Sequence, residues 1–252
     1  MEAEFSEFAY SEALVRELQL ALRPEVAVGP LFGRIATELE EQVPDAGVPL
    51  FLRFHLADCM LTPRATGWLE QQARFYRVEL PPRYRSQQHN VLRRLSEKEP
   101  EVYYAAPAFY RQREFSAAFA SAQIIQESRF FRLGELPDLT DDGYHYIAYR
   151  REEGGFRWLA QDSRPIHLPV TGEDWLRHVR SLALKPRSLG WQFLLGLRQD
   201  LASCLQQTEV QPPLFDELAV DLKDVTPLTV LRDLRYLLLT HFGLEALILR
   251  SA

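Results

Sequence analysis

The stretch Leu50-Phe51-Leu52-Arg53-Phe54-His55-Leu56 decides the fold of this chain, because it has the pattern of a strand that is apolar except at two positions. Side chains alternate along a strand, so Arg53 and His55 share one face with Phe51. A run this apolar belongs inside a sheet that is covered on both faces, where an unpaired cation is strongly destabilising. Arg53 and His55 must therefore meet partners or border a cavity, and a cavity beside a central strand is a place for chemistry.

The segment before this strand predicts an amphipathic helix. Residues 4–22 have the helical period and the pattern stops before Pro24. Glu12 falls on the apolar stripe of this helix, so we expect its carboxylate on the buried side. The apolar members of the stripe recur at spacings of three and four, at Phe5, Phe8, Val15, Leu18 and Leu22.

Helices and strands alternate along the first half of the chain. The strand over 49–56 is followed by a short helix, a strand, a helix, a strand and a helix, at about 65–72, 75–80, 86–97, 102–106 and 113–124. Such alternation with short links predicts an α/β domain built around a mostly covered sheet.

The pattern changes beyond residue 136. Strands over 144–150 and 156–160 flank a hairpin turn, long helical patterns follow at 191–206 and 227–242, and 244–249 could be a last strand. We expect a core over 1–135 and a hairpin-plus-helix part over 136–252, which either stand apart or pack as one body. The two leucine-rich helices are either buried against the sheet or form a surface that docks a protein partner.

Composition and charge limit the class of protein. The 252 residues are 46% hydrophobic and 25% charged, which is ordinary for a soluble globular protein. No stretch approaches the roughly 18 apolar residues that span a bilayer, and the acidic first residues do not read as a secretory signal. The two cysteines, Cys59 and Cys204, give no disulfide framework, so we expect reduced thiols in a cytoplasmic protein.

The charge is unevenly distributed. A formal net charge of −6 argues against a general nucleic-acid coat, yet residues 53–113 hold 11 basic and 6 acidic side chains. Residues 1–52 hold 3 basic and 10 acidic ones. The basic segment either faces phosphates or pairs with the acidic segment inside the molecule. The sequence contains no Gly-x-Ser-x-Gly, phosphate-binding glycine loop or His-Glu-x-x-His motif.

Polar residues occur in an order that resembles a known superfamily. Glu12 on the first helix, Asp45 at the entry to the sheet, and then Arg53 and His55 two apart on the strand follow the order of the PD-(D/E)XK nuclease superfamily. In that superfamily the helix is followed by strands carrying Asp and (Asp/Glu/Gln)-x-Lys. The likeness covers roughly residues 5–135.

Further short motifs extend the resemblance. The chain is similar to a group of bacterial proteins in which the strand reads Leu-Phe-Leu-Gln-Phe-Lys and is followed by three more motifs. Here those motifs read Phe75-Tyr76-Arg77, Gln87-Gln88-His89 and Tyr103-Tyr104-Ala105-Ala106-Pro107-Ala108-Phe109. The resemblance implies a restriction-endonuclease-like core sheet flanked by helices, and a site made by Glu12, Asp45, Arg53, His55 and Gln88.

The departures from the superfamily's pattern bear on its chemistry. The resemblance implies a Mg²⁺ ion held by Glu12 and Asp45, which would activate water for phosphodiester cleavage. Arg53, however, stands where a metal ligand would be, and a guanidinium has no lone pair for a metal. His55 stands at the lysine position and is mostly neutral at pH 7.

Three readings of these residues stay open. The first is a pseudoenzyme whose altered site no longer runs Mg²⁺-dependent hydrolysis, because Arg53 takes the place of the cation. The second is an active nuclease with His55 as general base and Arg53 clamping phosphate. In the third, the four charged residues form a buried ion network in an unrelated α/β fold.

The resemblance also implies partners. We expect association with nucleic acid, DNA above all, and a place as a subunit of a bacterial protein complex, antiviral defence being the guess that the superfamily suggests. On this view phosphates are contacted by Arg83, Arg85, Arg93 and Arg94. The alternative for Arg93 and Arg94 is a solvated helix face with local ion pairs.

Overall fold

The computed structural model describes most of the chain. The described residues are 1–30, 46–65, 73–82, 88–99, 101–152, 156–159, 164–166, 171–189, 191–206 and 227–251. Asp45, Arg83 and Arg85, to which the sequence assigns site roles, lie outside them.

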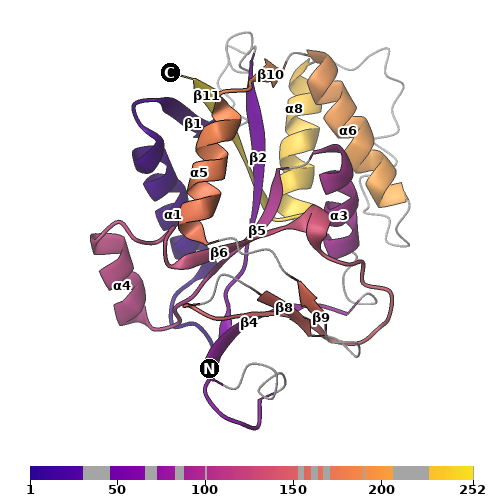
Figure 1. The fold of residues 1–252 in the computed structure, drawn as a ribbon. Helices are drawn as coiled ribbons and strands as arrows, with labels where there is room; N and C mark the ends of the chain where they lie inside the picture. The colour runs from indigo at the N-terminus through magenta and orange to yellow at the C-terminus, as the bar shows by residue number, and fades with distance from the viewer. Residues whose placement is uncertain are drawn as a thin grey trace.

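The main sheet is mixed and has strand β2 at its centre, as the opening stretch predicts (Figure 1). Strand β2 pairs parallel with β5 and antiparallel with β11, while β1 extends the sheet beyond β11 and β6 extends it beyond β5. The two-residue strand β10 (Arg187–Ser188) pairs with the start of β2. The five principal strands, in spatial order, are β1 (Val26–Pro30), β11 (Leu244–Ser251), β2 (Ala46–Phe54), β5 (Val102–Pro107) and β6 (Ser128–Arg132).

Helices cover both faces of this sheet, which is why β2 carries apolar side chains on each side. Leu50, Leu52 and Phe54 pack in one core with α1 (Glu7–Leu22) and α5 (Gly172–Ala183). Phe51 packs in the other core, which three further helices complete: α3 (Gln88–Lys98), α6 (Trp191–Gln206) and α8 (Pro227–Tyr236), the last extended by a π-helical turn, η4 (Leu237–His241). The prediction of an α/β architecture with a mostly covered sheet is confirmed.

The leucines of the C-terminal helices are buried against the sheet. The second core includes Leu194, Leu197 and Leu201 of α6 and Val230 and Leu234 of α8. These side chains of α6 and α8 are therefore buried in the core of the protein itself. Partner docking through these helices stays a prediction.

A second sheet, entirely antiparallel, lies beside the main one. Strands β7 and β8 of this sheet pair antiparallel and form the hairpin that the sequence predicts. Tyr76 and Ile147 from this sheet enter the same core as Phe51. The strands, in spatial order, are β3 (Asp58–Met60), β4 (Phe75–Leu80), β7 (His145–Tyr149), β8 (Phe156–Leu159) and β9 (Arg164–Ile166).

Two short helices complete the described elements. Helix α4 (Gln112–Ala120) follows β5, and the 3-10 turn η2 (Leu133–Glu135) follows β6. The last strand, β11, lies between β1 and β2, so the first and the second half of the sequence contribute to one sheet.

The buried face of α1 differs from the predicted one. Ser6 caps the helix through its hydroxyl, and the buried positions are Tyr10, Ala13, Leu14, Glu17, Leu18 and Leu22. Glu12 is exposed, and Phe8 is 75% exposed. The prediction that Glu12 lies on the buried side is therefore wrong, because the true stripe is rotated by about one residue and Glu17 is the acid that it carries.

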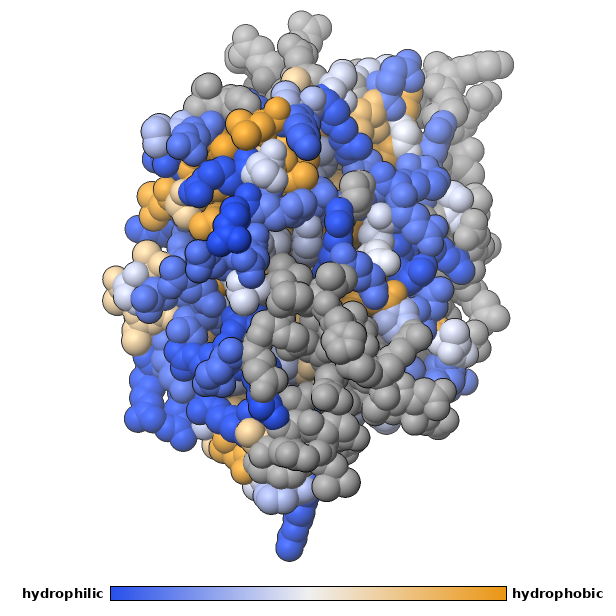
Figure 2. Space-filling view, viewed as in Figure 1, coloured by the Kyte–Doolittle hydropathy of each residue, from blue (hydrophilic) through white to orange (hydrophobic). Residues whose placement is uncertain are grey.

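The side of the sheet covered by α1 and α5 also carries apolar side chains on its outer surface. Figure 2 shows hydrophobic residues gathered over these two helices, at the upper left of the view, among hydrophilic neighbours. Leu20 and Leu184 are among the exposed large apolar residues. Folded proteins commonly expose apolar atoms, and these residues lie on the face of the sheet away from the side chain of Phe51.

Candidate functional site

The guanidinium of Arg53 is the centre of the predicted site. Arg53 ends the apolar part of β2, opposite Leu244 of β11. Its Nη1 donates a hydrogen bond to Glu7 Oε1 at 2.6 Å and lies 3.4 Å from the carbonyl oxygen of Gly243. The side chain of Arg53 is 20% exposed and that of Glu7 is 43% exposed, so the ion pair stands at the rim of the core. The sequence correctly predicts that Arg53 meets a partner, although the acid is Glu7 and not Glu12.

Gly243 allows this arrangement. Its φ angle is +54°, a conformation that residues with a Cβ adopt at a cost. A Cβ on Gly243 would also lie 2.9 Å from Nη1 and 3.0 Å from Cζ of Arg53. The turn that leads into β11 is therefore shaped around the guanidinium.

His55 follows Arg53 by two residues, and its ring is neutral at pH 7 because its pKa is lowered. Its ring meets the ring of Tyr104 edge to face, with centroids 4.7 Å apart. The Nε2 atom is buried and has no hydrogen-bond partner among the residues that the structure describes. Burial, helped by the positive charge of Arg53, lowers the pKa of His55 to about 3. A ring with this pKa is not an imidazolium at neutral pH, so it cannot act as a general acid there and is only a weak base.

Tyr104 and His89 continue the cluster away from the rim. His89 Nε2 lies 2.9 Å from the carbonyl oxygen of Pro137, and its Nδ1 lies 3.0 Å from the hydroxyl of Tyr104. Burial lowers the pKa of His89 to about 4, so the ring is neutral. A carbonyl oxygen only accepts, hence Nε2 carries the hydrogen and Nδ1 accepts from the Tyr104 hydroxyl. Burial also raises the pKa of Tyr104, which keeps this hydroxyl protonated.

Gln88 joins α3 to the same turn. Its side-chain amide donates to the carbonyl oxygen of Phe242, the residue before Gly243. Of the predicted site residues, Arg53, His55 and Gln88 thus lie around the end of β2 and the start of β11. The prediction did not include Glu7, His89, Tyr104 or Gly243. Glu7 lies five residues before Glu12, about 140° away around the same helix, so the choice between them depends on the direction of the buried face, which the sequence pattern places wrongly.

Glu12 lies in a different place. It lines a shallow hollow of about 420 Å³ that also includes Phe8, Gln19 and Glu245. Glu245 lies on the same face of β11 as Leu247 and Leu249, because side chains two residues apart on a strand point the same way. Leu247 and Leu249 pack in the core with α1, so this hollow is on the α1 side of the sheet. Arg53 has Glu7 as its ion-pair partner among the described residues, and Glu12 is not part of that pair.

The described residues do not fit a magnesium site. Arg53 offers no lone pair, and its charge repels a cation from the position beside Glu7. Across the described ranges, no three His, Cys, Asp or Glu side chains lie close enough together to hold a metal ion. Asp45 lies outside those ranges, so the pairing of Glu12 with Asp45 stays a prediction.

The basic residues of α3 are partly used within the fold. Arg93 forms ion pairs with Glu97 at 2.9 Å and Asp138 at 3.4 Å, and its Nε also donates to the carbonyl oxygen of Leu136. Arg94 is half-buried on the same helix. The geometry around Arg93 matches the alternative of local ion pairs, and phosphate contacts by either arginine stay predictions.

Comparison with known proteins gives no relative for this chain: no family model, no curated protein and no solved structure matches it. The resemblance to PD-(D/E)XK nucleases therefore stands on the sequence motifs alone. Within the described residues, no helix has the length and apolar character needed to cross a bilayer.

Proposed function

We propose that this chain is a nucleic-acid-associated protein with a PD-(D/E)XK-like core that binds a phosphate backbone without cutting it, as a subunit of a larger bacterial assembly. One observation supports the proposal above all. The cation at the end of β2 is a guanidinium, paired with the single carboxylate of Glu7 at the rim of the core.

The chemistry of this pair suits binding. A guanidinium offers five N–H donors, and two of them can engage a phosphate together. Glu7 is more exposed than Arg53, so an incoming phosphate oxygen can replace its carboxylate without opening the core. Glu7 would then act as a competitor that weakens, and so tunes, the affinity of Arg53 for phosphates.

The same geometry argues against hydrolysis by His55. General bases work best with a pKa near the pH at which they act, whereas the pKa of His55 is lowered to about 3. Its free ring nitrogen is also covered. No described contact favours the alternative of an active nuclease, so binding is the function that we carry forward.

Fluorescence anisotropy with labelled single-stranded and duplex DNA tests the proposal. We expect Arg53→Ala to weaken binding about tenfold, as for the loss of a charged hydrogen bond. The slope of log K against log salt should fall by about 1. Glu7→Gln should tighten binding, because the carboxylate no longer competes for Arg53.

A matched control separates a specific role of Arg53 from the effect of losing any one positive charge. Arg177 on α5 is 67% exposed and paired with Glu173 and Asp174, so Arg177→Ala removes the same charge elsewhere. Its affinity should match the wild type. Equal losses in both arginine variants would contradict a role for Arg53. Incubation with plasmid and single-stranded DNA plus Mg²⁺ or Mn²⁺ tests the alternative, and cleavage that disappears in Asp45→Ala would overturn the binding proposal.

A further inference from the structure

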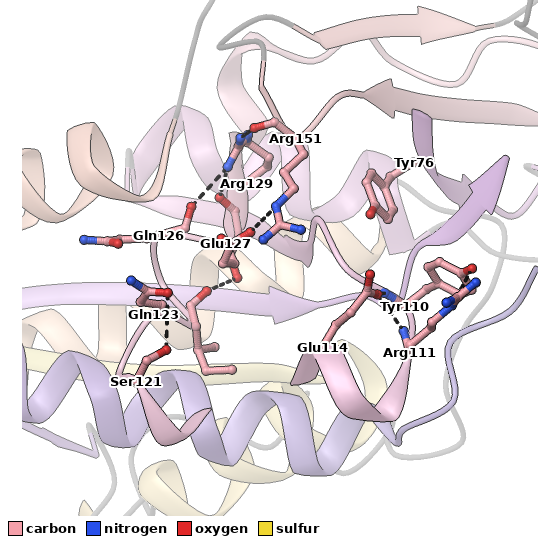
Figure 3. A network of polar contacts seen from close by, with 12 residues as sticks. Tyr76, Tyr110, Arg111, Glu114, Ser121, Gln123, Gln126, Glu127, Arg129 and Arg151 are labelled. Atoms are coloured by element: carbon pink, nitrogen blue, oxygen red, sulfur yellow. Dashed lines mark hydrogen bonds and ion pairs between the residues drawn. The ribbon is translucent and has the colours of Figure 1, made fainter. Parts of the chain in front are cut away.

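A second cationic hollow lies away from Arg53, between the second sheet and the start of α4. Its volume is about 240 Å³. The lining comes from the start of β4 and from the residues that follow β7: Ala73, Arg74, Tyr76, Arg150, Arg151 and Glu152. Figure 3 shows the side chains of Arg151, Tyr76 and Glu114 arranged around this space. Among the residues that the structure describes, three arginines and one acid line this small hollow.

Arg74 is held in place on one side. Its guanidinium lies over the rings of Tyr76 and Tyr110, at 5.2 and 5.3 Å from their centroids, and donates to the hydroxyl of Tyr76. Glu114 lies 3.6 Å away, but its Oε2 already accepts from the backbone N–H groups of Tyr110 and Arg111. Arg74 is therefore positioned by stacking as much as by its carboxylate.

Arg151 is held on the opposite side. Its Nε pairs with Glu127 Oε2 at 2.6 Å, which leaves the two Nη groups of the fork on the other edge of the guanidinium. The side chains of Arg74 and Arg151 are each 43% exposed. Arg74 is thus fixed in direction by its ring contacts and Arg151 by Glu127, and both are still open to an incoming ligand.

A further buried cation strengthens the positive field behind the hollow. Arg129 is 7% exposed and donates to the carbonyl oxygens of Gln126, Ser128 and Arg151 (Figure 3). Among the described residues no carboxylate lies within 4.0 Å of it, so its charge is not compensated by a direct ion pair. Burial lowers the pKa of Arg129, as expected for a cation in this setting. Within the part of the cluster that the structure describes, the four arginines Arg74, Arg129, Arg150 and Arg151 outnumber the three carboxylates of Glu114, Glu127 and Glu152.

The size and the shape of the cluster select the ligand. A volume of about 240 Å³ admits a phosphate group but falls below the range that holds drug-sized ligands. The guanidinium of Arg74 covers the rings of Tyr76 and Tyr110, so these rings offer no open platform on which a base could stack. We propose that this hollow binds a phosphate dianion, either inorganic phosphate or the terminal phosphate of a nucleotide chain. This inference stands apart from the proposed role of Arg53.

Calorimetric titration of the full chain with inorganic phosphate tests the inference. We expect binding that weakens about tenfold in Arg151→Gln, which keeps a hydrogen-bond donor but loses the charge. Glu152→Gln should bind more tightly, because an exposed acid leaves the lining. Because this second change improves binding, a loss of fold cannot produce it. Arg177→Gln on α5 is the control and should bind as the wild type does.

Competition identifies the source of the phosphate. Two oligonucleotides of one sequence, with a 5′-phosphate and with a 5′-hydroxyl, are added to the phosphate complex. Displacement by the phosphorylated strand alone, or by neither strand, supports a dianion site with the terminal or the free phosphate as its ligand. Equal displacement by both strands would assign the hollow to backbone phosphodiesters and overturn the inference. So would a failure of millimolar phosphate to bind, or equal affinities in Arg151→Gln and the wild type.

Discussion

Glu17 is the acid that α1 buries, and it holds the turn that follows α4. Its two carboxylate oxygens accept hydrogen bonds from the backbone N–H groups of Ile124 at 2.7 Å and Ile125 at 3.1 Å. Burial raises the pKa of Glu17 while these two donors oppose the shift. Glu17 therefore satisfies two backbone donors, those of Ile124 and Ile125, for which no other side-chain acceptor is found among the described residues.

Replacing this acid tests its role. We expect Glu17→Ala to lower the free energy of unfolding by about 2–4 kcal/mol, because two buried N–H groups lose a charged acceptor. Glu12→Ala on the same helix is the control and should change it by about 0.5 kcal/mol or less. Urea unfolding followed by circular dichroism measures both. Similar effects of the two substitutions would contradict the observed orientation of α1.

A second residue-scale prediction concerns Gly243. Gly243→Ala combines a positive φ with a contact of about 3 Å to the guanidinium of Arg53. We expect a loss of stability of about 1–3 kcal/mol. In the double variant Gly243→Ala/Arg53→Ala the contact is gone, so the added loss from the alanine should shrink. A double-mutant cycle measures this coupling, and strictly additive effects would show that the two residues act independently.

At this scale the sequence predicts only part of the site, since it names Arg53, His55 and Gln88 but not Glu7, His89, Tyr104 or Gly243. An arginine in an apolar strand must find a partner, and Arg53 does pair with Glu7, whereas the buried Nε2 of His55 has no partner among the described residues. Gln88, which the resemblance rather than the desolvation argument implies, lies at the same turn. The desolvation argument cannot choose between Glu7 and Glu12, because both project from one helix and the direction of its buried stripe depends on what α1 packs against. Gly243 is 190 residues away from Arg53 in the sequence, so no local sequence pattern predicts that the two are in contact.

The way α5 docks is decided by a single close approach. Gly172 begins the helix, and a Cβ at this position would lie 1.7 Å from the backbone oxygen of Ile125. One turn further, Trp175 stacks on Phe130 with ring centroids 3.7 Å apart. Any side chain at Gly172 must therefore push the helix away from β6 and open this stack.

Two glycine substitutions in helices should have opposite signs. We expect Gly172→Ala to destabilise the protein by about 3 kcal/mol or more, because the backbone itself has to move. Gly196→Ala in α6 adds a Cβ with nothing within 4 Å and should stabilise it by about 0.5–1 kcal/mol. Thermal unfolding of both variants checks the pair. A neutral Gly172→Ala would mean that α5 can shift freely on the sheet.

The individual elements could be predicted, but their pairing could not. Short, nearly continuous apolar runs correctly predict β2, β5 and β11, and the helices α3 and α4 begin within two residues of their expected positions. Nothing in the sequence of β4 tells that it leaves the main sheet and pairs with β3 and β7. Register and sheet membership depend on contacts between distant segments, which a local pattern does not encode.

For the whole molecule, the two buried histidines predict how stability depends on pH. The pKa values of His55 and His89 fall from 6.5 to about 3 and about 4 on folding. Between about pH 4 and 6.5 the unfolded chain therefore binds more protons at these rings than the folded one. Stability contributed by their neutral forms is present above this window and is lost as the pH falls through it.

The variant His89→Gln separates the contribution of His89 to the pH dependence of stability from that of the buried acids. We expect the stability of the wild type to rise with pH more steeply than that of His89→Gln, by about 1.4 kcal/mol per pH unit within the window. Urea unfolding of both proteins at about pH 4.5, 5.5 and 6.5 measures the difference in their free energies of unfolding. These pH values span the range between the folded and unfolded pKa values of His89, about 4 and 6.5. Parallel curves for the two proteins would show that His89 takes up its proton in the folded state.

The position of β11 has a consequence for the protein while it is being made. A nascent chain that the ribosome has extended only as far as residue 236 already contains β1 and β2, yet it lacks the strand that joins them. Both strands then present open backbone edges, which favour self-association until translation supplies residues 244–251. Completion of the main sheet must wait for those residues, so it follows synthesis of α8 rather than accompanying synthesis of the first half.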